Sequence, residues 1–160
     1  MSERCPECGA RLRQGTACRD NFHDMLALEW QVPGGAGELA HFYAVSAYIL
    51  QHPDSMSYTV ESLAWLRTAV ADSLAHGARV EDLRAGARRE GRAAGRVTRR
   101  AGDSVRRRCV SGWSMTVADV LEAGVDDYCE HVRSWAASVI EDLAASGPAG
   151  AASGADDAPI

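Results

Sequence analysis

Several features that would point directly to a function are missing from this chain of 160 residues. It has no lysine, so all seventeen basic residues are arginines. It has no apolar run of about eighteen residues, which excludes a transmembrane helix on length. It also lacks P-loop, GxGxxG, GxSxG and HExxH motifs, which excludes the common nucleotide-binding, hydrolase and metalloprotease signatures. No set of residues therefore stands out as a nucleophile with its base.

The N-terminal sequence MSERCPEC lacks the apolar core of a signal peptide, so we expect a cytoplasmic protein. The chain has five cysteines, an odd number, and three of them lie near the N-terminus. In a reducing compartment, clustered cysteines bind metal more often than they form disulfides. The N-terminal cysteines are therefore the first candidates for a metal site.

These cysteines have the spacing of a zinc knuckle. The segment Cys5-x-x-Cys8-Gly9 is a turn in which two thiolates converge on one ion, and the glycine lets the backbone fold over the sulfurs. Structural zinc sites have four tetrahedral ligands, often three cysteines and a histidine. Cys18 is the natural third ligand. We predict a closed, structural zinc site, because four protein ligands leave no open position for water.

Two histidines compete for the fourth position. His23 follows Cys18 and gives the pattern C-x₂-C-x₉-C-x₄-H, so it is the predicted ligand. His52 is the alternative, since antiparallel packing of the first two predicted helices would return it to the side of Cys18. A metal-free thiol pair or a redox CxxC competes with the zinc site, but a thioredoxin-type CxxC needs a βαβ context that is absent here. Thiolates also suit iron, which is therefore the competing metal for this site.

Hydrophobic periodicity predicts a mainly α fold, a small helical bundle with the N-terminal zinc knuckle and a long C-terminal helix. We expect one domain over 1–145, with a knuckle loop at 1–19, a helical body at 20–145 and a disordered tail at 146–160. Five helices are predicted. The first covers 20–32 and is capped by Asp20, the second covers 38–51, the third runs from its cap Thr59 to Gly77, and the fourth covers 80–90. The last starts from a capping box of Thr116 and Asp119 and runs to 145.

Charge is distributed unevenly along the chain. The net charge is −5, but the segment Arg79–Arg108 holds eleven arginines and four acidic residues. Arginine binds phosphate well, so this segment is a candidate contact for a protein or nucleic-acid partner, and no membrane partner is expected. It has no interleaved aromatic residues for stacking on bases. We favour the interpretation that the protein's own acidic helices balance this charge.

Glu29 and His41 form the second candidate site. Each is predicted on the inner face of its helix, and antiparallel packing would bring them together. A hydrogen-bonded core pair is the preferred interpretation, because buried polar groups need partners. The alternative is a second metal site, joined by His131, of an enzyme of the small helical-bundle kind. Cys109 and Cys129 are separate from the knuckle and are expected to be small apolar groups.

Four motifs carry a resemblance to a known family: CPxCGA from Cys5, C-R-D-x-F-H from Cys18, LQHP at 50–53 and WxMTxADV from Trp113. Together they resemble an uncharacterised bacterial family among the domains of unknown function, family 5946 of that series. The resemblance covers nearly the whole chain except the tail, and it implies no activity or substrate. We therefore expect a structural-zinc binding or adaptor module, with a metal-dependent enzyme using Glu29 and His41, or a thiol-based redox or metal sensor, as alternatives.

Overall fold

The computed structural model describes residues 3–77, 79–93, 110 and 112–146. In this part of the chain the fold is mainly α, as predicted, and it contains no β-strand beyond one isolated bridge. The helices are α1 (Cys18–Leu28), α2 (Gly37–Gln51), α3 (Pro53–Met56), α4 (Val60–His76), α5 (Val80–Ala93), α6 (Val117–Ala123) and α7 (Tyr128–Ala145). None of these helices combines the length and apolar character needed to cross a bilayer. Residues 147–160 of the predicted tail, residues 94–108 of the arginine-rich segment and Cys109 lie outside the described residues.

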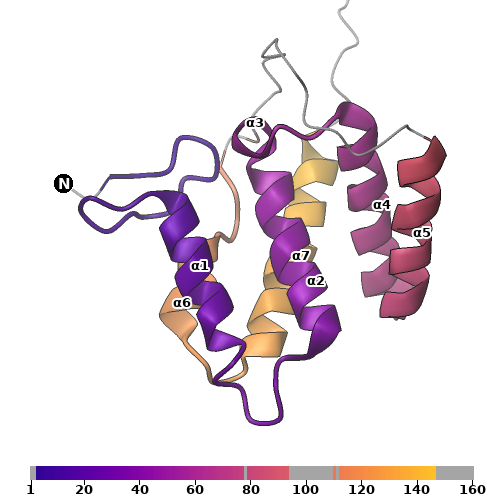
Figure 1. The fold of residues 1–160 in the computed structure, drawn as a ribbon. Helices are drawn as coiled ribbons and strands as arrows, with labels where there is room; N and C mark the ends of the chain where they lie inside the picture. The colour runs from indigo at the N-terminus through magenta and orange to yellow at the C-terminus, as the bar shows by residue number, and fades with distance from the viewer. Residues whose placement is uncertain (1–2, 78, 94–109, 111, 147–160) are drawn as a thin grey trace, which may run out of the picture.

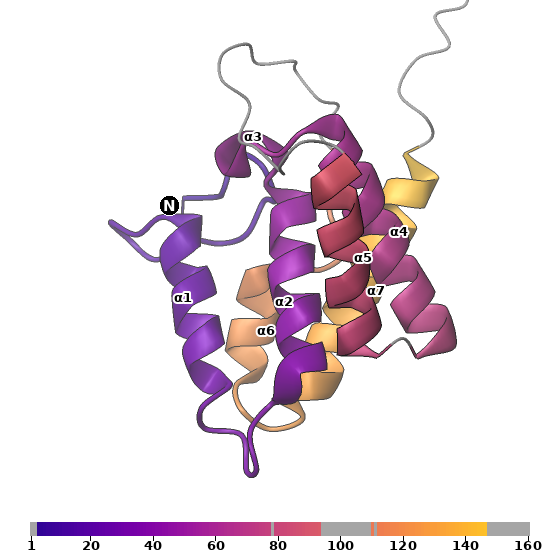
Figure 2. The ribbon, with the colours of Figure 1, turned by 45° about the vertical axis from the view of Figure 1, so that its right-hand side comes forward.

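The longer helices run side by side, with α2 near the centre (Figure 1). It packs against α7 and α4, while α1 packs against α6 on one flank. On the other flank α5 lies against α2 and α4 (Figure 2). Helices α1 and α2 are antiparallel, so the start of α1 and the end of α2 lie at the same end of the bundle, beside the N-terminal loop.

Helix α1 begins earlier than predicted. It starts at Cys18, with Ala17 at the N-cap position, and ends at Leu28. Asp20, the predicted cap, lies inside the helix, and its Oδ2 accepts a hydrogen bond from the Ala17 N–H at 2.7 Å. The correction matters because it places Cys18 in the first helical position, where the dipole favours a thiolate.

The predicted last helix is divided in two, and the prediction of one continuous helix was wrong. Gly124 ends α6 with φ +79° and ψ −153°, a conformation that belongs almost only to glycine. The apolar spacing continues across Gly124, so periodicity alone did not reveal the break. The capping interaction at the start of α6 is confirmed, since Asp119 Oδ2 accepts from the Thr116 N–H at 2.7 Å. α7 remains as the long C-terminal helix.

The ends of α4 agree with the prediction. Thr59 Oγ1 accepts a hydrogen bond from the Ser62 N–H at 3.2 Å, and Gly77 closes the helix with φ +67°. Pro53 ends α2 as expected, but it also starts the short helix α3, which was not predicted. α5 extends three residues past its predicted end. Local capping chemistry thus set the ends of α4 and the start of α6.

A buried polar bridge ties the core together. Trp135 of α7 is fully buried, and its indole N–H donates to Gln51 Oε1 at 3.2 Å. The Gln51 amide in turn donates to the Met115 carbonyl at 2.7 Å, just before α6. The end of α2 is thereby fixed against both C-terminal helices, which holds His52 in place.

Candidate metal centre

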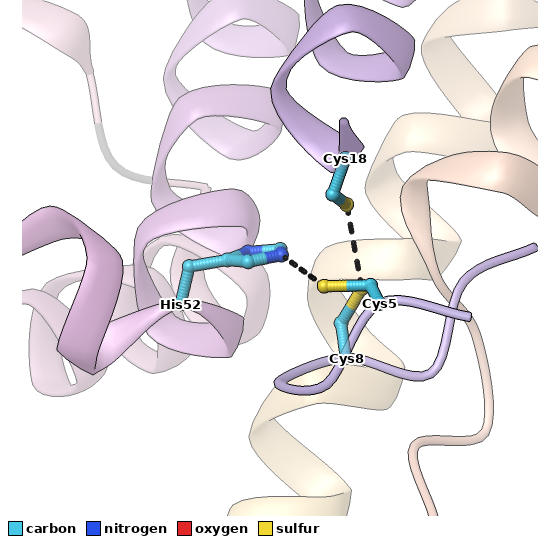
Figure 3. A group of neighbouring side chains, drawn as sticks. All are labelled: Cys5, Cys8, Cys18 and His52. Carbon is cyan, nitrogen blue, oxygen red and sulfur yellow. Dashed lines mark hydrogen bonds between the residues drawn. The ribbon is translucent and has the colours of Figure 1, made fainter. Parts of the chain in front are cut away.

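A short hairpin carries the first two cysteines. The Cys5 N–H donates to the Ala10 carbonyl at 2.9 Å, and the Gly9 N–H donates to the Cys5 carbonyl at 2.9 Å. Gly9 has φ +75°, so the glycine of the motif has the positive φ that such a turn requires. The hairpin folds the chain so that the side chains of Cys5 and Cys8 point to one place (Figure 3).

Four side chains from three parts of the chain converge there (Figure 3). Cys5 and Cys8 come from the hairpin, Cys18 from the start of α1, and His52 from the residue after α2. All four are buried, and their ligand atoms lie within 4.8 Å of one another. Cys8 Sγ lies 3.6 Å from Cys18 Sγ, and Cys5 Sγ lies 3.5 Å from His52 Nε2. The structure therefore brings together a buried group of three sulfurs and one imidazole nitrogen.

These distances fit a tetrahedral metal site. Zinc–sulfur bonds of about 2.3 Å and zinc–nitrogen bonds of about 2.0–2.1 Å at tetrahedral angles place two sulfurs about 3.8 Å apart. The same geometry places a sulfur about 3.6 Å from the nitrogen. The two measured separations, 3.6 Å and 3.5 Å, are close to these values. The group can hold one metal ion without a large rearrangement.

The ring of His52 is held so that its Nε2 faces the Cys5 sulfur. Its Nδ1 lies 2.8 Å from the Tyr48 carbonyl, which can only accept, so Nδ1 carries a hydrogen and Nε2 is the nitrogen left to face the sulfurs. This is the usual support of a metal-bound histidine. The Tyr48 ring stacks on the imidazole at 4.0 Å, and Phe22 of α1 stacks on Tyr48 at 4.0 Å. Packing and one hydrogen bond thus fix the imidazole.

The buried side chains of this group shift one another's protonation. Hydrogen bonding to Cys18 and Cys8 lowers the pKa of Cys5, and the same contacts with Cys5 and Cys8 raise the pKa of Cys18. Burial alone favours neutral His52, but its contacts with Cys5 and Cys8 outweigh burial and raise its pKa to about 10. Burial, and then the charge of the cysteines, raises the pKa of Tyr48. A divalent cation would displace the thiol protons and hold the cysteines as thiolates, because thiols bind metals in that form.

The structure does not bring His23, the predicted fourth ligand, to this group. Its side chain is exposed, whereas the alternative, His52, is 1% exposed and lies among the cysteines. The reason is helical geometry, because five residues along α1 rotate a side chain by about 500°, which leaves it about 140° away from Cys18. The antiparallel return of α2 supplies His52 instead.

The hairpin is held by contacts that sequence reasoning missed. The Glu7 carboxylate accepts from the Ser55 N–H at 2.9 Å and from its hydroxyl at 3.1 Å. The Trp113 indole N–H donates to the Glu7 carbonyl at 3.2 Å. Glu7 occupies the variable position of the CxxC motif, and nothing in its local sequence signals these distant partners.

Glu29 and His41 lie together as predicted, with His41 Nδ1 2.8 Å from Glu29 Oε2. The Tyr128 hydroxyl donates to Glu29 Oε1 at 3.2 Å, and burial and this carboxylate raise the pKa of Tyr128. His41 is 54% exposed, so this is not the expected core pair. Among the described residues, neither His131 nor another metal-binding side chain completes a metal-sized group with them. Cys129 is exposed, against expectation, and its Sγ donates to the Ala36 carbonyl at 3.4 Å.

Comparison with known proteins places the chain in a family. A family model described as a family of unknown function, DUF5946, matches residues 3–144. The chain belongs to this family. The match includes all four residues of the buried group and every described helix except the last residue of α7. No curated protein and no solved structure matched the chain. The chemistry of the site itself must therefore carry the argument about function.

Proposed function

We propose that Cys5, Cys8, Cys18 and His52 hold one structural zinc ion, and that the protein is a zinc-stabilised helical module that binds another macromolecule. The observation that supports this most is the buried group of three sulfurs and one nitrogen at near-tetrahedral separations. Such a group occurs where a metal is part of the fold, because burying three thiols and an imidazole together is otherwise costly.

A structural role fits better than a catalytic one. The four side chains are only 1–7% exposed, so they enclose the ion and leave no open position for water or substrate. Three thiolates and one histidine in a tetrahedral group are a common structural zinc set. The hydrogen bond from His52 to Tyr48 and the aromatic stack further restrict the ligand geometry.

Metal analysis tests the proposal directly. The full chain, purified without a metal-binding tag, should contain one zinc per protein by mass spectrometry, with anomalous scattering at the zinc edge centred among the four residues. His52→Ala should lose most of the metal, while the matched control His23→Ala keeps it, because His23 is exposed and outside the group. Protein without zinc, protein with iron in its place, or loss of metal only in His23→Ala would overturn the assignment.

The candidate partner contact is the arginine-rich segment Arg79–Arg108. In its described part, Arg84 pairs with Glu38 at 2.9 Å and Arg79 lies 3.9 Å from Glu81, so the protein itself offsets some of the charge. Because these pairs leave less unpaired positive charge for the phosphates of a nucleic acid, they support a protein partner. Titration with a labelled duplex at 50 and 200 mM salt is the test, since a phosphate-driven complex weakens steeply with salt. Tight, salt-sensitive binding would favour nucleic acid instead.

The enzyme alternative draws on one observation, the hydrogen-bonded Glu29–His41 pair with its Tyr128 partner. It requires a second, exchangeable metal at this pair. Metal titration of the zinc-loaded protein should show no second site under our proposal. A second metal that binds the native chain and is lost in His41→Ala would favour the enzyme.

The sensor alternative draws on the 3.6 Å separation of Cys8 and Cys18 sulfurs. In that case one peroxide molecule would take two electrons from the two thiolates and, with two protons, be reduced to water. The two sulfurs would then form a disulfide, and the zinc would be released. Our proposal expects the zinc to stay bound when one equivalent of peroxide is added. Reversible release of zinc with loss of two thiols, restored by a reductant, would favour the sensor.

A further inference from the structure

A second site lies between α2, α4 and α5, and none of the four cysteine and histidine residues lines it. It is a cavity of about 650 Å³, within the usual size range of small-molecule sites. Its walls are mostly apolar and aromatic. The main wall residues are Phe42, Val45 and Ile49 of α2, Trp65 and Leu66 of α4, and Leu83 of α5.

The polar groups of this cavity gather at one end. Glu38 and His41 belong to the first turns of α2, near the loop that follows α1. Arg84 of α5 reaches Glu38 at 2.9 Å, and Glu29 from the end of α1 holds His41 at 2.8 Å. Further along α2 the wall is formed by side chains such as Ile49. The cavity is therefore amphipathic, with a charged end and an apolar body.

At the charged end, the carboxylates already accept hydrogen bonds, and the Arg84 guanidinium has N–H groups to spare. Both oxygens of Glu29 accept, one from His41 and one from Tyr128, and Glu38 accepts from Arg84. In the described part of the chain, only one guanidinium nitrogen of Arg84 donates a hydrogen bond. The ligand chemistry that complements this end is an anionic acceptor, and guanidinium suits a carboxylate.

A third observation marks the same end as a binding surface. Trp30 lines the cavity and is 90% exposed, the most exposed large apolar side chain in the described chain. Trp30 extends the apolar lining of the cavity to the surface, and extended exposed apolar patches mark ligand-binding sites.

We propose that this cavity binds an amphipathic monocarboxylate, such as a medium-chain fatty acid, with its carboxylate at Arg84. The hydrocarbon then lies between α2, α4 and α5 and is removed from water, which supplies most of the affinity. The charged end selects the headgroup. This inference does not depend on the metal, because the two sites share no residue.

The test compares three ligands that share one apolar body: decanoate, decanol and decylammonium, each below its micelle concentration. Calorimetry or tryptophan fluorescence of the full chain follows binding, since Trp65 and Trp30 line the cavity. We expect saturable one-to-one binding of decanoate, at least fivefold tighter than either of the other two. Tighter binding of decylammonium, equal binding of decanol, or no saturable binding of decanoate would overturn the proposal.

Variants locate the site. Arg84→Gln should weaken decanoate at least fivefold and leave decanol unchanged, while Arg19→Gln, on an exposed position of α1 outside the cavity, should behave like the native chain. Val45→Trp should fill the cavity and abolish binding of both ligands. Circular dichroism and zinc content confirm that each variant is folded. Unchanged decanoate affinity in Arg84→Gln would refute the assigned headgroup end, even if Val45→Trp failed to fold.

Discussion

His52 shows how much one buried side chain can contribute when three kinds of contact meet on it. Its ring is 1% exposed, stacks on Tyr48, donates to the Tyr48 carbonyl and faces the Cys5 sulfur. We predict that His52→Ala lowers the free energy of unfolding by about 3 kcal/mol or more, because a metal ligand and core packing are lost together. Chemical denaturation of metal-loaded protein measures this. His23→Ala should change stability by less than about 0.5 kcal/mol, and equal losses in both variants would contradict the assignment.

Gln51 allows a second prediction at this scale. Gln51→Leu keeps the side-chain volume but leaves the Trp135 indole N–H and the Met115 carbonyl without their partner. We expect a loss of about 2–4 kcal/mol, since each unsatisfied buried group costs about 1–3 kcal/mol. Gln31→Leu is the matched control, because Gln31 is exposed. A thermal or urea melt in which the two variants unfold alike would show that the bridge contributes nothing.

The sequence predicted the site residues that lie close together in the chain better than it predicted contacts between distant residues. The spacing of Cys5, Cys8 and Cys18 predicted three members of the buried group, because a CxxC turn and a nearby cysteine are close in sequence. The choice between two histidines depended on helix geometry, and the first choice, His23, is not the residue that the structure places there. Glu7 and its contacts to distant residues could not be foreseen, since no periodicity or motif encodes them.

At the scale of the element, the break between α6 and α7 depends on one glycine. Gly124 has φ +79° and ψ −153°, and space around it is open, so conformation alone demands glycine. We predict that Gly124→Ala lowers stability by about 1–3 kcal/mol. Gly86→Ala, inside α5, should instead raise stability by up to about 1 kcal/mol, because its Cβ meets Trp65 at an ordinary 3.6 Å and alanine favours the helix. A rise in the melting temperature of Gly124→Ala would contradict the argument.

Helix ends followed from the sequence where capping chemistry is local. Thr59, Gly77 and the pair of Thr116 and Asp119 predicted their boundaries because the donors and acceptors lie within four residues. The break at Gly124 was missed because the apolar residues of α6 and α7 continue one helical period across it. The start of α1 was missed because Ala17, at the N-cap, has no capping side chain.

At the scale of the whole molecule, one antiparallel turn organises both candidate sites. Helices α1 and α2 run in opposite directions, so the end of α2 returns to the start of α1, and the start of α2 lies beside the end of α1. The first meeting brings His52 to Cys18, and the second brings His41 to Glu29. Antiparallel packing was predictable from the short connection between the helices; it predicted the Glu29–His41 pairing and gave His52 beside Cys18 only as the alternative to His23.

The hairpin and the bundle should respond differently to loss of the metal, and this gives the last prediction. The knuckle hairpin has few internal hydrogen bonds, so without an ion its order depends on contacts such as Glu7 with Trp113. The packing of α2 against α7 includes the buried Trp135 and its hydrogen bond to Gln51, and none of the metal ligands lies within either helix. A strong chelator under reducing conditions should therefore lower the melting temperature by about 10 °C or more, since zinc binding is part of folding, while most helical circular dichroism remains at 25 °C.

Tryptophan fluorescence should change in the native chain, whereas Trp113→Phe should lose that response, because Trp113 contacts the hairpin. Re-addition of zinc, and not of magnesium, should restore the native melting temperature, because magnesium prefers oxygen ligands. An unchanged melting curve after the metal has been removed would mean that the four side chains come together without needing an ion.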